Sequence, residues 1–256
     1  MSRQRVHLLQ LSYGDDEPLV ARVARVADLV RAQRGADLVL LPELWPDGGF
    51  SYQTWEASAQ RLAGPTVTAL AEAAREVGAV VHMGSFVERD QDGRLFNTSV
   101  LLAADGSVLT TYRKVHLFGF EAGEPVLLTA GEKPVVHGSL GLATCYDLRF
   151  PEIFRLLLDA GAETVLLPAA WPAKRVGHWR LLAQARAVEN QSYVVACNTA
   201  GTHAGVAMGG HSIVVDPWGV VLAEAGDGEE VLVVDLDPDL VATARASFPV
   251  LADRRL

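Results

Sequence analysis

The chain contains almost the same twelve-residue segment twice, and this repeat constrains the fold more than any other feature. Residues 35–46 read GADLVLLPELWP, and residues 161–172 read GAETVLLPAAWP. A run of Val and Leu that ends in proline predicts a buried strand stopping at the edge of a sheet, because proline cannot donate the next ladder hydrogen bond. A helix-like stretch precedes each copy, which is typical of layered α/β proteins. Strand ends can share such letters for structural reasons alone, but those reasons do not explain why Glu43 in the first copy becomes Ala169 in the second.

Helices and strands alternate in both halves of the chain, with hairpins between the halves. Apolar residues at helical spacing predict helices over residues 18–33, 53–62, 65–77, 151–160, 179–190 and 238–245. Apolar runs predict strands over residues 6–12, 38–41, 79–85, 140–144, 164–167, 193–198, 211–216, 220–223 and 231–236. Two Asp-Gly pairs between alternating segments predict a hairpin meander before Lys114. We therefore expect one α/β domain over residues 1–256, a four-layer α-β-β-α sandwich of two mixed sheets.

The composition excludes several classes of partner. A formal net charge of −9 over 256 residues speaks against a nucleic-acid surface, because phosphate binding requires clustered Lys and Arg. No stretch approaches the roughly 20 consecutive apolar residues that span a bilayer, so we expect no membrane partner and a cytoplasmic location. The two cysteines, Cys145 and Cys197, do not indicate a disulfide framework, and no residue spacing indicates a metal site.

Three reactive side chains lie near the ends of predicted strands: Glu43 in LLPELWP, Lys114 in TYRKVHLFGF and Cys145 in GLATCYDLRFPE. Strand ends at the edge of a sheet are where open α/β folds place reactive groups. Each residue has a plain structural alternative, namely an ion-paired carboxylate, an exposed hairpin lysine and a buried thiol. A buried Glu43 can instead accept the proton of a thiol, and a buried Lys114 can hold an oxyanion. Backbone N–H groups at a helix start would favour the anion on Cys145.

The motifs around these three residues, taken together and in this order, resemble the nitrilase superfamily of carbon–nitrogen hydrolases. The resemblance covers nearly the whole chain and includes VLLPAAWP, HWRLLAQARAVENQSYVVACNTAG and GHSIVVDPWG. It implies an α-β-β-α sandwich with internal pseudo-symmetry, a homodimer, and a catalytic triad that by motif match is Glu43, Lys114 and Cys145. The resemblance implies no metal and no organic cofactor.

The same resemblance implies further residues at the site. A second glutamate follows the lysine motif in this family, and the loop spacing favours Glu124 over Glu121. The backbone N–H of Tyr146 would complete an oxyanion hole. In the second copy of the repeat, Ala169 and its neighbour would leave room for substrate and Trp171 would close the pocket, although Trp171 is equally typical of a core aromatic.

Within the superfamily, the chain is most similar to small-amide hydrolases such as omega-amidases and deaminated-glutathione amidases. That similarity implies a small-molecule amide substrate that carries a carboxylate. A carboxylate requires a cation in the pocket, and the candidates are Arg149, Lys174, Arg175 and His178.

Three alternative functions stay open at the level of sequence. A nitrilase or an N-carbamoyl hydrolase would use the same triad on another carbon–nitrogen bond. An acyltransferase would let an amine intercept the thioester. A non-enzymatic scaffold would retain the fold without activity, and the presence of all three reactive residues in matching contexts argues against it.

Overall fold

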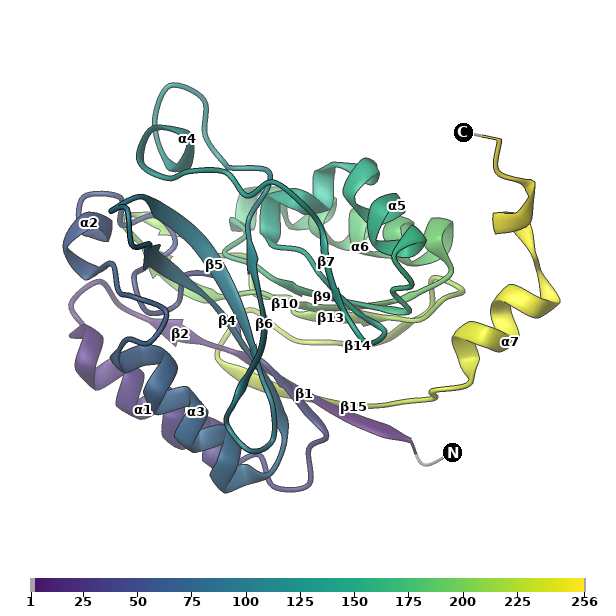
Figure 1. The fold of residues 1–256 in the computed structure, drawn as a ribbon, viewed down its shortest axis with the longest axis horizontal. Coiled ribbons are helices and arrows are strands. Elements are labelled where there is room, and N and C mark those ends of the chain that lie inside the picture. Colours follow the sequence, from purple (N-terminus) through teal and green to yellow (C-terminus); the bar gives the residue numbers. More distant parts are fainter. Residues whose placement is uncertain (1–2, 256) are drawn as a thin grey trace.

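The computed structural model describes residues 3–255 and contains two six-stranded sheets that lie face to face (Figure 1). The first sheet has the order β15 (Glu230–Leu236), β1 (Gln4–Gln10), β3 (Leu38–Leu40), β4 (Val80–Arg89), β5 (Leu95–Leu102) and β6 (Val108–Arg113). The second has the order β14 (Val221–Glu224), β13 (Ile213–Val215), β10 (Tyr193–Cys197), β9 (Thr164–Pro168), β8 (Leu140–Leu142) and β7 (Val135–His137). A small third sheet joins β12 (Val206–Ala207), β11 (Ala200–His203) and β2 (Ser12–Tyr13).

Helices cover the outer face of each large sheet. The first sheet is covered by α1 (Leu19–Arg31) and α3 (Pro65–Val77), and the second by α5 (Pro151–Asp159) and α6 (Val176–Asn190) (Figure 1). The shorter helices are α2 (Trp55–Ser58), α4 (Glu124–Leu127) and α7 (Leu240–Ser247), with 3-10 segments η1 (Cys145–Arg149), η2 (Ala173–Arg175) and η3 (Val250–Asp253). The predicted α-β-β-α sandwich is therefore confirmed.

The two large sheets share one plan, and this plan explains the repeated segment. In the first sheet β1, β3 and β4 are parallel neighbours, and in the second β8, β9 and β10 are parallel neighbours. Antiparallel strands flank each trio, so the order β15-β1-β3-β4-β5-β6 corresponds to β7-β8-β9-β10-β13-β14. The two copies of the repeat supply the equivalent central strands β3 and β9, which gives the molecule its internal pseudo-symmetry.

The repeat strands are apolar throughout because both of their faces are buried. In the first copy, Leu38 and Leu40 belong to the core between the two sheets, whereas Val39 and Leu41 pack with residues of α1 and α3. Alternate side chains of a strand point to opposite faces, so a strand covered on both sides reads as a continuous apolar run.

Two predicted boundaries were wrong for identifiable reasons. The helix expected over residues 53–62 is only α2, because Gln60 pairs with β4: its N–H donates to Val87 O (3.0 Å) and its carbonyl accepts from Arg89 N (2.8 Å). The strand expected to stop before Pro168 includes it, because the ladder continues one residue later through Ala169 N and Cys197 O (2.8 Å). The edge strand β7 was not predicted, since three residues give too short a pattern.

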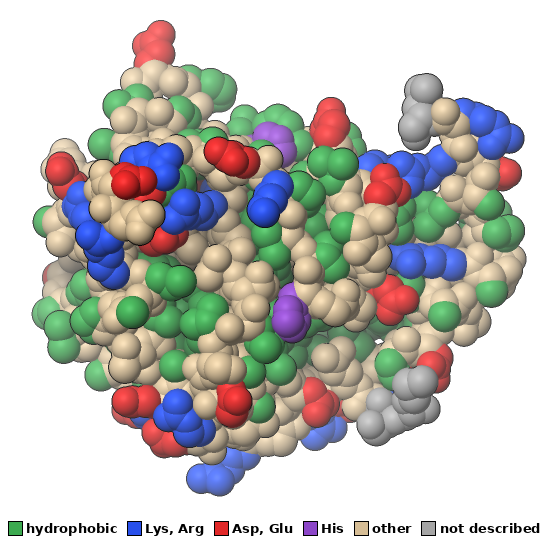
Figure 2. Space-filling view, in the orientation of Figure 1, with side chains coloured by type: hydrophobic (Ala, Val, Ile, Leu, Met, Phe, Trp, Pro, Cys, Tyr) green, Lys and Arg blue, Asp and Glu red, His purple; other side chains and the backbone are tan. Residues whose placement is uncertain are grey.

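Charged side chains of both signs are mixed over the face of the molecule drawn in Figure 2. Within residues 3–255, no helix combines the length and the apolar composition needed to cross a membrane.

Candidate active site

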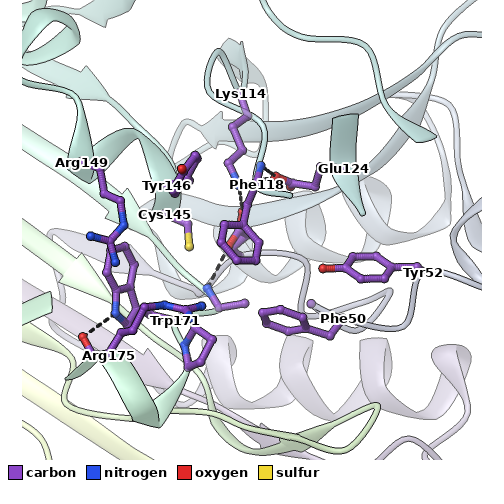
Figure 3. Close-up of a pocket in the computed structure, with 14 residues that line it drawn as sticks. Phe50, Tyr52, Lys114, Phe118, Glu124, Cys145, Tyr146, Arg149, Trp171 and Arg175 are labelled. Carbon is purple, nitrogen blue, oxygen red and sulfur yellow. Dashed lines mark hydrogen bonds and ion pairs between the residues drawn. The ribbon is translucent and has the colours of Figure 1, made fainter. Parts of the chain in front are cut away.

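Glu43, Lys114 and Cys145 converge on one cleft from the ends of three different strands. Glu43 follows β3, Lys114 follows β6, and Cys145 lies just beyond β8 as the first residue of η1. Because β8 belongs to the second sheet and the other two strands to the first, the cleft is built from both halves of the sandwich. All three side chains line it, and Figure 3 shows Lys114 and Cys145 pointing into it.

The carboxylate of Glu43 is held by groups from both halves. Its Oε1 accepts hydrogen bonds from Lys114 Nζ (2.7 Å) and Asn97 Nδ2 (2.9 Å), and its Oε2 accepts one from the backbone N–H of Ala170 (2.9 Å). The backbone N–H of Glu43 donates in turn to Ala169 O (3.3 Å). The backbone of the second copy of the repeat thus contacts the end of the first copy, and the Glu43 carboxylate links the two strand ends.

Glu124 forms the other side of the charged cluster. It accepts hydrogen bonds from Lys114 Nζ (2.8 Å) and Asn97 Nδ2 (2.7 Å), and also from the backbone N–H of Phe118. Burial raises the pKa of Glu124; the Lys114 charge opposes this rise, and the Glu43 charge adds to it. Burial by itself lowers the pKa of Lys114, but the two glutamates outweigh it and hold that pKa well above its usual range. Lys114 is therefore a fixed cation.

Cys145 occupies a sharp turn between strand and helix. Its φ of 44° lies in the left-handed region that side chains other than glycine rarely adopt, and such strain is typical of functional sites. Burial raises the pKa of the Cys145 thiol, and the negative charge of Glu43 raises it further, while Lys114 acts in the opposite direction. The resting thiol therefore keeps its proton and needs a base at the moment of attack.

Asp147 fixes this turn to the segment that carries Lys114. Its carboxylate accepts hydrogen bonds from Thr144 N (2.8 Å), Tyr112 Oη (2.7 Å) and His116 N (3.0 Å). Thr144 and Asp147 also form a capping box at the start of η1. Because the side chain of Asp147 is fully buried, these bonds set the distance between the nucleophile and the lysine strand.

The cleft has one aromatic and one cationic side (Figure 3). Phe50, Tyr52 and Phe118 lie on one side, and Trp171 lies with two arginines on the other. The remaining lining residues are Glu43, Gly49, Lys114, Glu124, Cys145, Tyr146, Ala170 and Pro172. Apolar and aromatic walls with a few convergent polar groups are typical of small-molecule sites.

The structure places most of the predicted secondary residues at the cleft. Glu124, Tyr146 and Trp171 line it, whereas Glu121 is exposed on the neighbouring loop. Tyr146 is the second residue of η1, where backbone N–H groups have no acceptor within the helix. The prediction for Ala169 needs correction, because its methyl group belongs to the apolar core and the cleft is lined by Ala170 instead.

Arg149 and Arg175 line the cleft without a carboxylate partner within residues 3–255. The Arg149 guanidinium lies over the Trp171 ring, 4.7 Å from its centroid, and that of Arg175 lies 5.3 Å from the centroid of Phe118. Burial lowers the pKa of Arg149, and the charge of Arg175 lowers it further. Of the other predicted cations, His178 contacts Arg149 (3.4 Å) and Lys174 does not line the cleft. Guanidiniums without a carboxylate partner have the charge and the donor geometry to bind an anion.

Sequence reasoning missed Asn97, Asp147 and the aromatic side of the cleft. Asn97 had one available signal, because the polar run Asn-Thr-Ser interrupts the apolar strand LFNTSVLL. Within residues 3–255, no group of three or more His, Cys, Asp or Glu side chains is placed to hold a metal ion.

Comparisons with known proteins show the family of this chain. A 2-oxoglutaramate amidase of Paenarthrobacter nicotinovorans is 44% identical, over 98% of this chain and 89% of its own. The crystal structure of Saccharomyces cerevisiae Nit3, a member of branch 10 of the nitrilase superfamily, superposes with a TM-score of 0.89 at 33% identity, covering 100% of this chain and 97% of its own.

A third similar protein shows a reacted cysteine. An amidase from Nesterenkonia sp. AN1, with the acetamide moiety of fluoroacetamide added covalently at its active-site cysteine, has a TM-score of 0.83 at 29% identity, covering 98% of this chain and 97% of its own. The family model for carbon-nitrogen hydrolases matches residues 5–246. The resemblance predicted from the motifs is thus confirmed: this chain belongs to the carbon–nitrogen hydrolase family of enzymes.

Proposed function

We propose that this enzyme is an amidase that hydrolyses the terminal amide of a short carboxylate-bearing acid, with 2-oxoglutaramate as the first candidate. The single observation that carries this proposal is the placement of two unpaired arginines, Arg149 and Arg175, in the same cleft as the Glu43, Lys114 and Cys145 cluster. The name of the Paenarthrobacter relative supports the choice of first substrate.

In the acylation step, Glu43 accepts the proton of the Cys145 thiol while the sulfur attacks the amide carbonyl carbon. The carbonyl oxygen becomes an oxyanion, which Lys114 Nζ and the Tyr146 N–H stabilise. When this tetrahedral intermediate collapses, the carbon–nitrogen bond breaks and Glu43 returns its proton to the leaving nitrogen. Ammonia departs, and the acyl group stays on Cys145 as a thioester.

In the deacylation step, Glu43 accepts a proton from water as the water oxygen attacks the thioester carbonyl. The same oxyanion hole stabilises the second tetrahedral intermediate. Its collapse breaks the carbon–sulfur bond, and Glu43 returns a proton to the Cys145 sulfur. The products are a carboxylic acid and the resting thiol, with no metal or organic cofactor in any step.

The two arginines would bind the distal carboxylate of the substrate. Arg149 follows the nucleophile by about one turn of η1, and Arg175 ends η2 on the same cationic side of the cleft (Figure 3). A guanidinium donates planar pairs of hydrogen bonds that match a carboxylate. This arrangement orients the scissile amide towards Cys145 and discriminates against neutral amides.

We also propose that the protein forms a homodimer through the outer face of α5 and α6. Leu156, Leu181 and Val188 are half or more exposed there, and Leu181 and Val188 lie two helical turns apart on one face of α6. The C-terminal segment folds back on its own chain, since Gln191 donates to Phe248 O (2.8 Å). Multi-angle light scattering should report a dimer for the parent and a monomer for Leu181→Asp; a monomeric parent would remove the proposal.

The test of function is ammonia release from a panel of short amides. The parent should release ammonia fastest from 2-oxoglutaramate, then from succinamate, and slowly from the neutral butyramide. Cys145→Ala should release none. Release of ammonia from a nitrile or an N-carbamoyl compound but from no amide would replace the amidase proposal. Product that appears only when an amine acceptor is added would point to acyl transfer.

A further inference from the structure

Asn97 uses one amide nitrogen to contact both glutamates of the site. It lies within β5 and is 1% exposed. Its Nδ2 lies 2.9 Å from Glu43 Oε1 and 2.7 Å from Glu124 Oε1. Lys114 Nζ contacts the same two carboxylates at 2.7 and 2.8 Å. Asn97 and Lys114 therefore close a buried ring of two donors and two acceptors.

The chemistry of this ring fixes the orientation of the Asn97 amide. An amide NH₂ group donates two hydrogen bonds, one for each carboxylate, whereas the amide oxygen would repel both. That oxygen, Oδ1, is buried and has no hydrogen-bond partner within residues 3–255. A buried acceptor without a partner costs folding free energy. The orientation of the amide thus satisfies the two glutamates and leaves its own oxygen without a hydrogen bond.

The ring also decides which oxygen of Glu43 is available for chemistry. A carboxylate oxygen has two lone pairs, and Asn97 and Lys114 occupy both of those on Oε1. The backbone N–H of Ala170 occupies one on Oε2. One lone pair of Oε2 remains, so this oxygen is the one that can take a proton from Cys145.

We propose that Asn97 is a positioning residue for the base: its hydrogen bonds fix the rotamer of Glu43 so that one lone pair of Oε2 stays available, and they stabilise the negative charge that the two carboxylates share. The proposal rests on the proposed role of Glu43 as base. The ionisable groups that interact with Glu43 are Lys114 just after β6, Glu124 from α4, Cys145 from η1, and Tyr13 and Tyr52; burial raises the pKa of both tyrosines, that of Tyr52 to about 12. Among them Lys114 is the cation that stabilises a negative charge, and neutral hydrogen bonds add to it: two from Asn97 and one each from the backbone N–H groups of Ala170 and Phe118.

The decisive variant is Asn97→Leu, which has nearly the same shape and donates no hydrogen bond. We expect kcat to fall about 10- to 100-fold with little change in KM, because a hydrogen bond to a charged group is lost. The acidic limb of the pH profile of kcat/KM should move to higher pH, because the buried carboxylates lose a hydrogen-bond donor that stabilises their negative charge. The matched control is Thr98→Val, the next residue of β5, which loses a 2.6 Å hydrogen bond to Glu88 away from the cleft.

The rate of Cys145 alkylation tests the role of Asn97 without depending on which amide is the substrate. Alkylation of Cys145 by iodoacetamide depends on the base but not on amide hydrolysis, and it should slow in Asn97→Leu with the same shift of its pH profile. If Asn97→Leu does not fold, Asn97→Asp takes its place, and the third carboxylate should slow alkylation further. Two results would overturn the proposal. One is an Asn97→Leu variant with unchanged kcat and unchanged alkylation rate. The other is a loss of rate that Thr98→Val shares and that leaves the pH profile unmoved. A shifted alkylation profile without turnover of any amide would leave Asn97 in its role and remove the proposed function.

Discussion

At the end of β3 the chain places the carboxylate of Glu43, whereas at the equivalent end of β9 it places the methyl group of Ala169. Both positions are buried, with 3% and 0% exposure. The carboxylate is surrounded by donors from β5, from the end of β6 and from the backbone of the second copy. The methyl group lies in the apolar core between the layers.

This difference shows how one strand plan can serve two purposes. A buried carboxylate is stable only where hydrogen bonds and a cation replace its water. Such donors and the Lys114 cation surround Glu43 at the end of β3, whereas Ala169 at the end of β9 lies among apolar side chains. The second half instead contributes the nucleophile, one wall and both arginines. The active site therefore depends on the loss of symmetry at this pair of positions.

The largest expected effect comes from removing the carboxylate of the first copy. In Glu43→Gln the side chain keeps its shape but cannot take the proton of Cys145, so kcat/KM for the best amide should fall about 10³-fold or more. Ammonia release measures this loss. Glu121→Gln, on the exposed loop, is the control and should retain full activity. Substantial activity in Glu43→Gln would show that another group acts as base.

The next effect comes from giving the second copy a carboxylate. Ala169→Glu buries a charge where the structure offers it no partner, so we expect the free energy of unfolding to fall by about 3–5 kcal/mol. Urea denaturation followed by tryptophan fluorescence measures the change, with Ala169→Ser as a control of similar size. A variant as stable as the parent would mean that the two strand ends are interchangeable.

A selective effect is expected from the cationic wall. Arg149→Leu should raise KM for 2-oxoglutaramate about 10- to 100-fold, because a charge-assisted pair of hydrogen bonds is lost. The kinetics of butyramide, which has no carboxylate, should change little. Lys174→Leu removes a nearby charge outside the cleft and is the control. Equal losses with both amides would assign Arg149 to bracing the η1 turn.

The last effect, which is absent near neutral pH and develops only in acid, concerns a second pair of equivalent positions, His82 in β4 and Val195 in β10. Burial lowers the pKa of His82 to about 3, below the value near 6.5 expected in the unfolded chain. The stability due to this group is present above about pH 6.5 and is lost as the pH falls towards 3, at about 1.4 kcal/mol per pH unit. His82→Val should make the free energy of unfolding less sensitive to acid over that range. An unchanged slope would mean that His82 binds a proton in the folded protein.

Much of this architecture could be predicted from the sequence, because apolar runs and Asp-Gly turns are local signals. The repeat strands, the hairpins and the convergence of Glu43 with Cys145 all rest on such signals together with the family motifs. The role of Asn97 could not be predicted, since it depends on the register between β5 and β6 rather than on neighbouring residues. Of the two alanines expected to leave room for substrate, Ala170 lines the cleft and Ala169 does not, because the direction of a side chain just beyond a strand depends on how that strand ends.

The central claim is that Cys145 carries the acyl group during hydrolysis. Rapid acid quenching during turnover of 2-oxoglutaramate, followed by intact-protein mass spectrometry, tests this claim most directly. We predict an adduct with the mass of the substrate less ammonia, located on the peptide that contains Cys145 and absent from Cys145→Ala. Ammonia release by Cys145→Ala at the parental rate, with no adduct on the parent at any quench time, would contradict the account.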